Sequence, residues 1–99
     1  MKYIIQKTHT FDKWLSKLKD PIALKAILIR IMRAENGNFG DCKKVGTTIQ
    51  EMRIFVSKGY RVYFTIKNNE IIFLLNAGHK GMQQQDIEQA HLLFSQLED

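Results

Sequence analysis

Residues 52–77 read MRIFVSKGYRVYFTIKNNEIIFLLNA, and this stretch decides the fold because it holds three strand-like runs separated by two turn sequences. The first turn is Ser57-Lys58-Gly59, which we interpret as a three-residue hairpin loop with Gly59 at the position of positive φ. This loop predicts a register that keeps apolar side chains together on one face of the hairpin. The predicted pairs are Ile54 with Val62 and Met52 with Phe64.

The other face of this hairpin carries arginines and aromatic residues. Because side chains alternate along a strand, the same register places Arg53 opposite Tyr63 and Phe55 opposite Arg61. The second turn, Asn68-Asn69, suits positive φ at both positions and predicts a two-residue hairpin loop. The pairs that it predicts are Ile66 with Ile71, Phe64 with Phe73 and Val62 with Leu75.

Residues 70–77 are apolar at odd and even positions alike in the middle of the run, which predicts a central strand covered on both faces. Residues 83–97 are predicted to form a helix, because their apolar residues recur at helical spacing. This helix either covers Ile72 and Leu74 of the central strand or forms a surface for a partner. Its apolar positions are Ile87, Ala90, Leu93, Phe94 and Leu97.

The N-terminal part of the chain is predicted to form a strand at residues 3–5 and then two helices. The first helix covers residues 11–18, with Thr8 or Thr10 as its N-cap. Asp20-Pro21 ends it and begins the second helix, because aspartate caps well and proline is tolerated in the first turn.

The second helix is predicted to end at Asn36-Gly37-Asn38. Residues 36–48 hold three glycines without a clear period, which predicts the longest loop of the chain. We expect the core face of this helix to consist of Leu24, Ile27, Leu28 and Ile31. On the opposite side we expect Lys25, Arg30 and Arg33, together with Ile29.

Length, composition and charge narrow the function classes. A chain of 99 residues forms one domain rather than a large multidomain enzyme. It shows neither a membrane span nor a signal peptide, so we expect a cytoplasmic protein. The single cysteine, Cys42, excludes an internal disulfide and a cysteine-rich zinc site.

The net charge of +5 suggests a polyanionic partner. Positive charge dominates residues 43–80. After residue 80 the chain has no lysine or arginine but four acidic residues, which are Asp86, Glu88, Glu98 and Asp99.

Several short motifs occur in a fixed order along nearly the whole chain. They are Phe11-Asp12-Lys13-Trp14-Leu15 with Leu18-Lys19-Asp20, Arg30-Ile31, Gly37-Asn38-Phe39-Gly40-Asp41, Glu51-Met52-Arg53-Ile54, Gly59-Tyr60-Arg61-Val62-Tyr63-Phe64, Gly78-His79-Lys80, Gln83, Asp86-Ile87 and Ala90. In this order they resemble the RelE/ParE toxin superfamily, specifically its HigB-like branch of phage-derived addiction module killer proteins. The resemblance implies an α+β, RelE-like fold in a single domain over residues 1–99. In that fold a two-helix hairpin packs on a mostly antiparallel four-stranded sheet (β-α-α-β-β-β), and a C-terminal helix follows.

The resemblance also implies a function, that of a bacterial type II toxin which inhibits translation by cutting mRNA on the ribosome. The implied partners are the ribosome, mRNA and a cognate antitoxin, which we expect to be a small helix-turn-helix protein; the oligomeric state stays open. The chain lacks carboxylate pairs and His/Cys clusters at ligand spacing, so we expect an endoribonuclease without a metal or other cofactor.

Five residues are candidates for the catalytic site. Arg53 and Arg61 lie on adjacent predicted strands and share a face, so both guanidinium groups could bind one phosphate. Lys80 follows Gly78-His79, and in similar toxins this Gly-x-Lys loop lies beside the active face. His79 has the pKa best suited to proton transfer, although similar toxins often carry aspartate there. Tyr63 could stack on a base or donate a proton.

Four further residues are candidates for RNA binding. Lys43 and Lys44 lie in the predicted long loop, where flexible cations can bind a backbone without reading sequence. Phe55 could stack on an exposed base, and Lys58 lies in the hairpin loop. For each candidate an ordinary surface or packing role stays open.

Two other functions remain open as well. One is a ParE-like poison of DNA gyrase on the same fold without catalytic chemistry, since one fold hosts several functions. The other is a non-toxic, phage-derived binding module.

Overall fold

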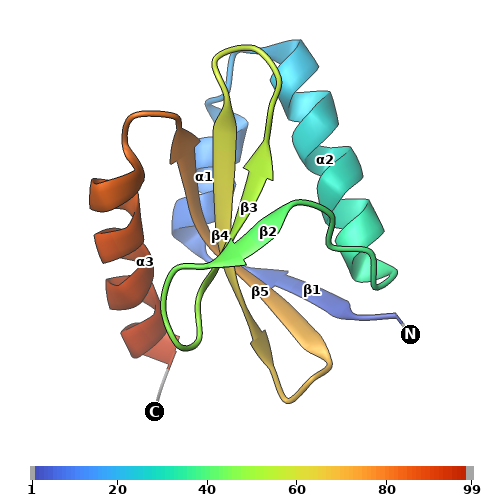
Figure 1. Ribbon diagram of the computed structural model, residues 1–99, viewed down its shortest axis with the longest axis vertical. Helices are drawn as coiled ribbons and strands as arrows, with labels where there is room; N and C mark the ends of the chain where they lie inside the picture. Colours follow the sequence, from blue (N-terminus) through green and yellow to red (C-terminus); the bar gives the residue numbers. More distant parts are fainter. Residues whose placement is uncertain (1, 98–99) are drawn as a thin grey trace.

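The computed structural model describes residues 2–97, which form eight elements (Figure 1). Glu98 and Asp99, part of the predicted acidic tail, lie outside the described residues. In the described part, no helix is long and apolar enough to span a bilayer. The elements in chain order are β1 (Ile4–Lys7), α1 (His9–Ser16), α2 (Pro21–Glu35), β2 (Cys42–Lys44), β3 (Gln50–Ile54), β4 (Tyr60–Lys67), β5 (Ile71–His79) and α3 (Gln83–Leu97).

The strands form one sheet in the order β1-β5-β4-β3-β2, in which β1 runs parallel to β5 and the other neighbours are antiparallel. This confirms the predicted α+β architecture with a mostly antiparallel sheet. The prediction of four strands was wrong by one, because β2 lies inside the segment predicted to be a loop. Three residues that include two lysines have no apolar alternation that could identify a strand.

The β3–β4 hairpin keeps its predicted faces but not its predicted register. Gly59 has positive φ as predicted, and Ser57 also has positive φ. The last paired residues are Ile54 and Tyr60, so the connection extends over residues 55–59. Each residue of β3 therefore pairs with the β4 residue two positions before its predicted partner. The observed pairs are Ile54 with Tyr60, Met52 with Val62, Arg53 with Arg61 and Glu51 with Tyr63. A slip of two residues leaves every side chain on its original face.

The β4–β5 hairpin departs further from prediction. Asn68 and Asn69 both have positive φ, as predicted, but Lys67 pairs with Ile71, so the loop holds three residues rather than two. A bulge between Tyr63 and Phe64 then leaves Leu75 without a partner. Because a slip of one residue exchanges the two faces of a strand, the predicted faces of β5 were wrong.

Each face of the sheet packs against different helices (Figure 1). The α1/α2 hairpin covers one face, which we call the α1/α2 face, and α3 covers part of the other, the α3 face. Burying each large apolar side chain in these layers stabilises the fold by about 1.5–3 kcal/mol. The α1/α2 core includes Phe11, Ala23, Ile27, Val62, Phe64, Ile72 and Leu74. The α3 core includes Ile49, Tyr63, Leu75 and Ala90, with Phe73 and Phe94 beside them.

These layers settle which helix covers the central strand. Residues 71–79 are covered on both faces as predicted, but Ile72 and Leu74 pack under α1 and α2 rather than under α3. The side chains that α3 covers are Phe73 and Leu75. The helix at residues 83–97 is itself confirmed.

The second helix begins where predicted, whereas α1 spans His9–Ser16 rather than residues 11–18, because Thr8 and not Thr10 is its N-cap. Thr8 caps α1 by accepting a hydrogen bond from the backbone N–H of Phe11, and Asp20 caps α2 by accepting from Ala23. The predicted core face of α2 was partly wrong. Leu28 is exposed, whereas Arg30 is half-buried and faces the sheet, because the buried stripe is centred on Ala23, Ile27 and Ala34.

Candidate functional site

The two predicted catalytic arginines lie directly opposite each other. Arg53 on β3 pairs with Arg61 on β4, and both lie on the α3 face, because their neighbours Met52, Ile54 and Val62 point into the α1/α2 core. Their exposure differs: the side chain of Arg53 is 33% exposed, and that of Arg61 is 12% exposed. Arg53 is therefore partly open to solvent, whereas Arg61 is mostly buried.

Arg61 belongs to a buried polar cluster with Glu51 and Tyr63. The Tyr63 hydroxyl donates to Glu51 Oε2 at 3.1 Å, and Arg61 Nε lies 3.6 Å from the same oxygen. Arg61 Nε is buried and has no hydrogen-bond partner within the described chain. Burial, followed by the negative charge of Glu51, raises the pKa of Tyr63 well above its ordinary value. Glu51 is thus the counter-ion of Arg61, and the phenol stays protonated.

Tyr63 cannot take the role predicted for it in this conformation. Its side chain is fully buried in the α3 core, so no base can stack on it and no leaving group can reach its hydroxyl.

Phe55, by contrast, is open to solvent, because it follows β3 and is 71% exposed. The guanidinium of Arg53 lies 6.0 Å from the centre of the Phe55 ring, so a cation and an open aromatic face occur together.

Arg53 is held by the segment before β2. Asp41 Oδ1 accepts hydrogen bonds from Arg53 Nε at 3.2 Å and from Arg53 Nη2 at 2.7 Å. Arg30 on α2 donates to three backbone carbonyl oxygens, those of Arg53, Phe39 and Asp41. Arg30 therefore fastens the loop that carries Asp41 to the end of β3.

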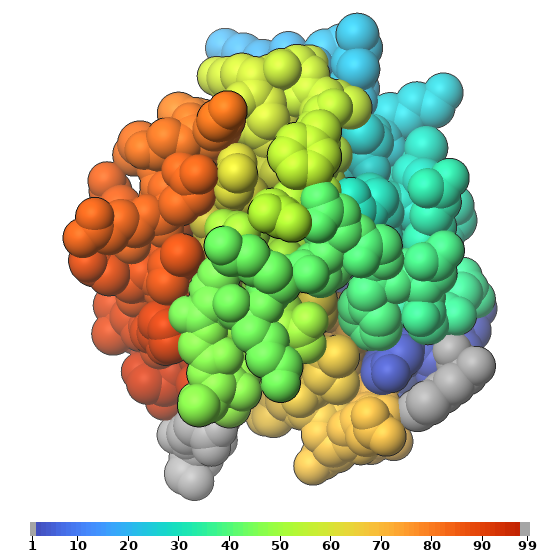
Figure 2. All heavy atoms as spheres, viewed as in Figure 1, coloured from blue at the N-terminus to red at the C-terminus, as the bar shows by residue number. Residues whose placement is uncertain are grey.

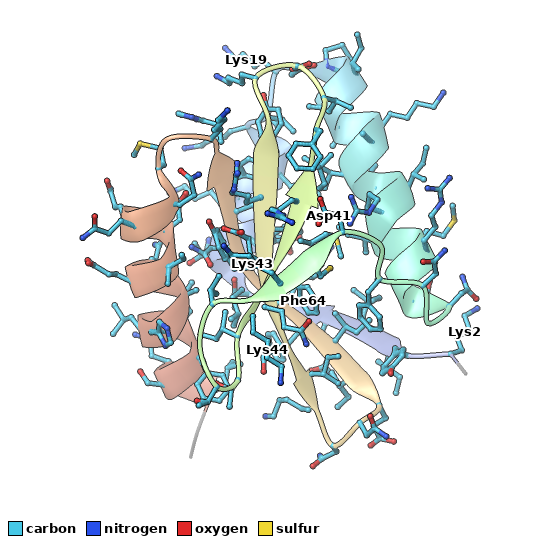
Figure 3. The ribbon with its side chains drawn as sticks, viewed as in Figure 1. Lys2, Lys19, Asp41, Lys43, Lys44 and Phe64 are labelled. Atoms are coloured by element: carbon cyan, nitrogen blue, oxygen red, sulfur yellow. The ribbon has the colours of Figure 1, made fainter. Side chains whose placement is uncertain are left out.

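Of the two lysines on β2, only one shares the face of the arginines. Lys43 pairs with Glu51, which is on the α3 face, whereas Lys44 pairs with Gln50 and lies on the other side. Both side chains are exposed, and Figure 3 shows them diverging from β2. Figure 2 shows β2 and the loop after it, in green, lying against α3, in orange and red. The close approach of Gly46 to the ring of His91 agrees with this contact.

The end of β5 separates Lys80 from His79. Lys80 continues the ladder by donating its backbone N–H to Gly59 O at 3.0 Å, and its side chain lies beside Gly59 on the α3 face. His79 points to the opposite face, because consecutive residues of a strand alternate, and lines a cleft with Trp14 and Tyr60. The structure thus brings Lys80 to the arginines but not His79.

The first turns of α3 border the arginine pair. Gly78, the β5 partner of Arg61, lies so close to Asp86 that a Cβ atom there would collide with the Asp86 carboxylate. Asn76 fixes this end of the helix by donating to Asp86 O at 2.9 Å. Burial raises the pKa of Asp86, and the nearby His79 opposes that shift.

Four charged residues of this region were missed in the sequence: Arg30, Asp41, Glu51 and Asp86. Alternation alone could have placed Glu51 beside Arg53, since the two are separated by one residue on one strand. The other three meet the site through contacts distant in sequence, for which no local pattern exists.

Comparison with known proteins places the chain in a family and in a fold. No protein-family model matches it. An uncharacterized protein from Haemophilus influenzae is 48% identical over 93 residues, which cover 94% of each chain. The two proteins belong to one family.

Solved structures of similar fold come from RelE proteins. The free E. coli toxin RelE, solved as a double arginine-to-alanine mutant, is 16% identical, has a TM-score of 0.68 and covers 92% of this chain and 97% of its own. In the toxin–antitoxin complex RelBE2 from Mycobacterium tuberculosis, the matching chain is 19% identical, with a TM-score of 0.66, and the match covers 81% of this chain and 100% of that chain. This chain accordingly has the RelE fold, and its assignment to the HigB-like branch stays a prediction.

The α3 face offers cations rather than metal ligands. Among residues 2–97, no group of three or more His, Cys, Asp and Glu side chains could hold a metal ion. The side chains gathered there are Arg53, Arg61, Lys43, Lys80 and Phe55, with Glu51, Asp41 and Asp86 as acidic neighbours. Such a set can bind a phosphate and stabilise additional negative charge on it.

Proposed function

We propose that the chain is the toxin of a toxin–antitoxin pair and that it is an endoribonuclease which cuts mRNA on the ribosome. The observation that carries the proposal is the direct pairing of Arg53 with Arg61 on one face of a RelE fold. Lys43 and Lys80 add positive charge to this face. Ribosomes and mRNA would place its action in the cytoplasm.

The proposed reaction needs no metal ion. The 2′-hydroxyl of a nucleotide attacks the adjacent phosphorus, the bond to the 5′-oxygen breaks, and a cyclic 2′,3′-phosphate and a free 5′-hydroxyl result. The attacking hydroxyl loses one proton and the leaving oxygen gains one. The phosphorane between these steps carries extra negative charge, which cations lower in energy. Arg53 contacts the phosphate in this proposal, and Arg61 contributes its charge from beneath.

An antitoxin is part of the proposal. The similar structures from M. tuberculosis and Pyrococcus horikoshii are toxin–antitoxin complexes. Exposed apolar side chains on α2, namely Ile22, Leu28 and Met32, offer surface that a protein partner would cover. We expect a small helix-turn-helix protein encoded beside this chain.

The test combines growth and cleavage. Expression of the chain should arrest bacterial growth, and purified protein should cut a defined message only when ribosomes translate it. Arg53→Ala and Arg61→Ala should each lower the cleavage rate by about 100-fold or more, the usual cost of losing one charge-stabilising donor. Arg33→Ala, which removes an exposed arginine from α2, is the matched control and should leave the rate unchanged.

Two outcomes would overturn the proposal. One is growth arrest with inhibited DNA supercoiling and no cut message, which is the behaviour of a gyrase poison. The other is unhindered growth at high expression of a folded chain, which fits a non-toxic binding module.

A further inference from the structure

A cleft of about 480 Å³ lies on the side of the sheet opposite the arginine pair. It opens between the α1–α2 junction, the tip of the β3–β4 hairpin and the end of β5. Figure 3 shows Lys19 at this end of the molecule, beyond the hairpin. The residues that give the cleft its character are Trp14, Lys17, Lys19, Lys58, Tyr60 and His79.

The rim of the cleft is strongly positive. Lys17, Lys19 and Lys58 are exposed, and none of them forms an ion pair within residues 2–97. The one acid in the lining, Asp20, is already occupied. It accepts from the backbone N–H of Ala23 at the start of α2 and lies 3.4 Å from the Tyr60 hydroxyl, and the bond from Ala23 is the main reason that its pKa is lowered. Asp20 keeps its negative charge but forms no ion pair with the lysines, so the lining carries three cations and one anion.

The floor of the cleft is aromatic, and the positive surface continues beyond it. The rings of Trp14 and Tyr60 meet edge to face with their centres 6.0 Å apart, and Trp14 is half-buried. A second groove along α1 shares Trp14 and Lys17 with the cleft and adds Lys13 and His9. A groove that follows cations and contains an aromatic side chain is the usual form of a single-stranded nucleic-acid site.

Resting on the function proposed above, we infer that this cleft binds the backbone of a single RNA strand outside the nucleotide that is cut. An acidic peptide is the competing occupant. The cleft offers a peptide the apolar side chains of Trp14 and Leu18, but both are half-buried. The large apolar side chains that are exposed on the described chain, such as Ile22, Met32 and Phe55, lie elsewhere and would anchor a peptide better. The hairpin between the two sides carries Arg53 on the strand before its tip and the exposed Lys58 at the tip, so one strand could cross the tip and touch both.

The chain supplies its own probe, because Trp14 is its only tryptophan. Purified protein is titrated with an eight-nucleotide oligouridylate without ribosomes, and tryptophan fluorescence is followed at several salt concentrations. The test variant carries Lys17→Gln, Lys19→Gln and Lys58→Gln. The control carries Lys2→Gln, Lys25→Gln and Lys67→Gln, which remove the same charge elsewhere.

We expect oligouridylate to quench Trp14 in the parent and in the control. The test variant should bind at least tenfold more weakly at low salt, and its slope of log affinity against log salt should fall by about 2, since each phosphate contact on a single strand contributes about 0.7. Equal losses in both variants, or equal quenching by polyglutamate of the same charge, would overturn the inference. Binding detected by anisotropy without any change at Trp14 would also overturn it.

The same experiment separates this inference from the proposed function. Arg61 lies outside the cleft, so in the Arg61→Ala variant oligouridylate should still quench Trp14 while cleavage is lost. If the parent binds RNA in the cleft but cuts no message, the proposed nuclease fails and the RNA site stands. If it cuts messages without any response at Trp14, the RNA site fails and the nuclease stands.

Discussion

Replacement of Glu51 by Gln tests whether the buried carboxylate holds Arg61 in place. Glutamine keeps an oxygen that can accept from the Tyr63 hydroxyl, so the substitution removes charge and little else. Arg61 would then be a largely buried cation with no counter-ion. Breaking a fully buried ion pair in this way costs about 3–5 kcal/mol. The pair is 3.6 Å apart and Arg61 keeps 12% of its surface exposed, so we expect about 2–3 kcal/mol.

Thermal and urea unfolding measure this effect. For a domain of this size, a loss of 2–3 kcal/mol lowers the Tm by roughly 10–20 °C. Glu70→Gln is the matched control, because it removes an exposed carboxylate at the β4–β5 turn, and it should change the free energy of unfolding by less than about 0.5 kcal/mol. Added salt should not reproduce the loss, since buried pairs are poorly screened.

A double-mutant cycle isolates the pair from other effects. Arg61→Met removes the cation, and in that background Glu51→Gln should cost much less, with a coupling energy of about 1–3 kcal/mol. A Glu51→Gln protein as stable as the parent, or a coupling energy near zero, would refute the assignment of Glu51 as the counter-ion of Arg61.

Three other predictions follow from contacts of the same region. Arg30→Met, which deletes bonds to three carbonyl oxygens, should lower the free energy of unfolding by about 2 kcal/mol in urea. Lys43→Ala should weaken ribosome binding and cleavage more than Lys44→Ala, because only Lys43 shares the α3 face; equal effects would contradict that placement. Asp86 has a raised pKa in the folded chain, so its ionised form destabilises the fold once the pH exceeds its ordinary value of 3.8. Asp86→Asn should therefore stabilise the protein at pH 7 and have little effect at pH 3, as thermal melts at both pH values would show.

Local signals in the sequence predicted the elements well. Thr8 and Asp20 are N-caps, Gly59, Asn68 and Asn69 have positive φ, and residues 83–97 form a helix, because each of these features depends on neighbours in the chain. Features that depend on distant residues were predicted less well. The three-residue β4–β5 loop exchanged the two faces of β5 as far as the bulge, and neither the extra loop residue nor the bulge that leaves Leu75 unpaired has a marker in the sequence.

The shared face of Arg53 and Arg61 was predicted correctly, although their direct pairing was not. Arg53 and Arg61 share a face in the predicted pairing and in the observed one, because a slip of two residues preserves parity. The same alternation of side chains separates His79 from the arginines, although His79 was predicted to lie with them in the catalytic site. It lies next to Gly78, the partner of Arg61, so alternation sends its ring to the opposite face.

Parity also explains why the sequence could not rank the two arginines. Alternation places Arg53 and Arg61 on one face, but their exposure is set by groups that approach from elsewhere in the chain. Asp41 comes from the loop before β2 and leaves Arg53 open, while Asp86 on α3 and Glu51 on β3 lie around Arg61. The division of work that we propose, with Arg53 on the phosphate and Arg61 beneath it, therefore rests on tertiary contacts.

This division of work predicts different effects of lysine at the two positions. Arg53→Lys should keep part of the cleavage activity, because a surface lysine can still reach a phosphate. Arg61→Lys should keep less, because a buried ammonium beside Glu51 has no room to move toward the substrate.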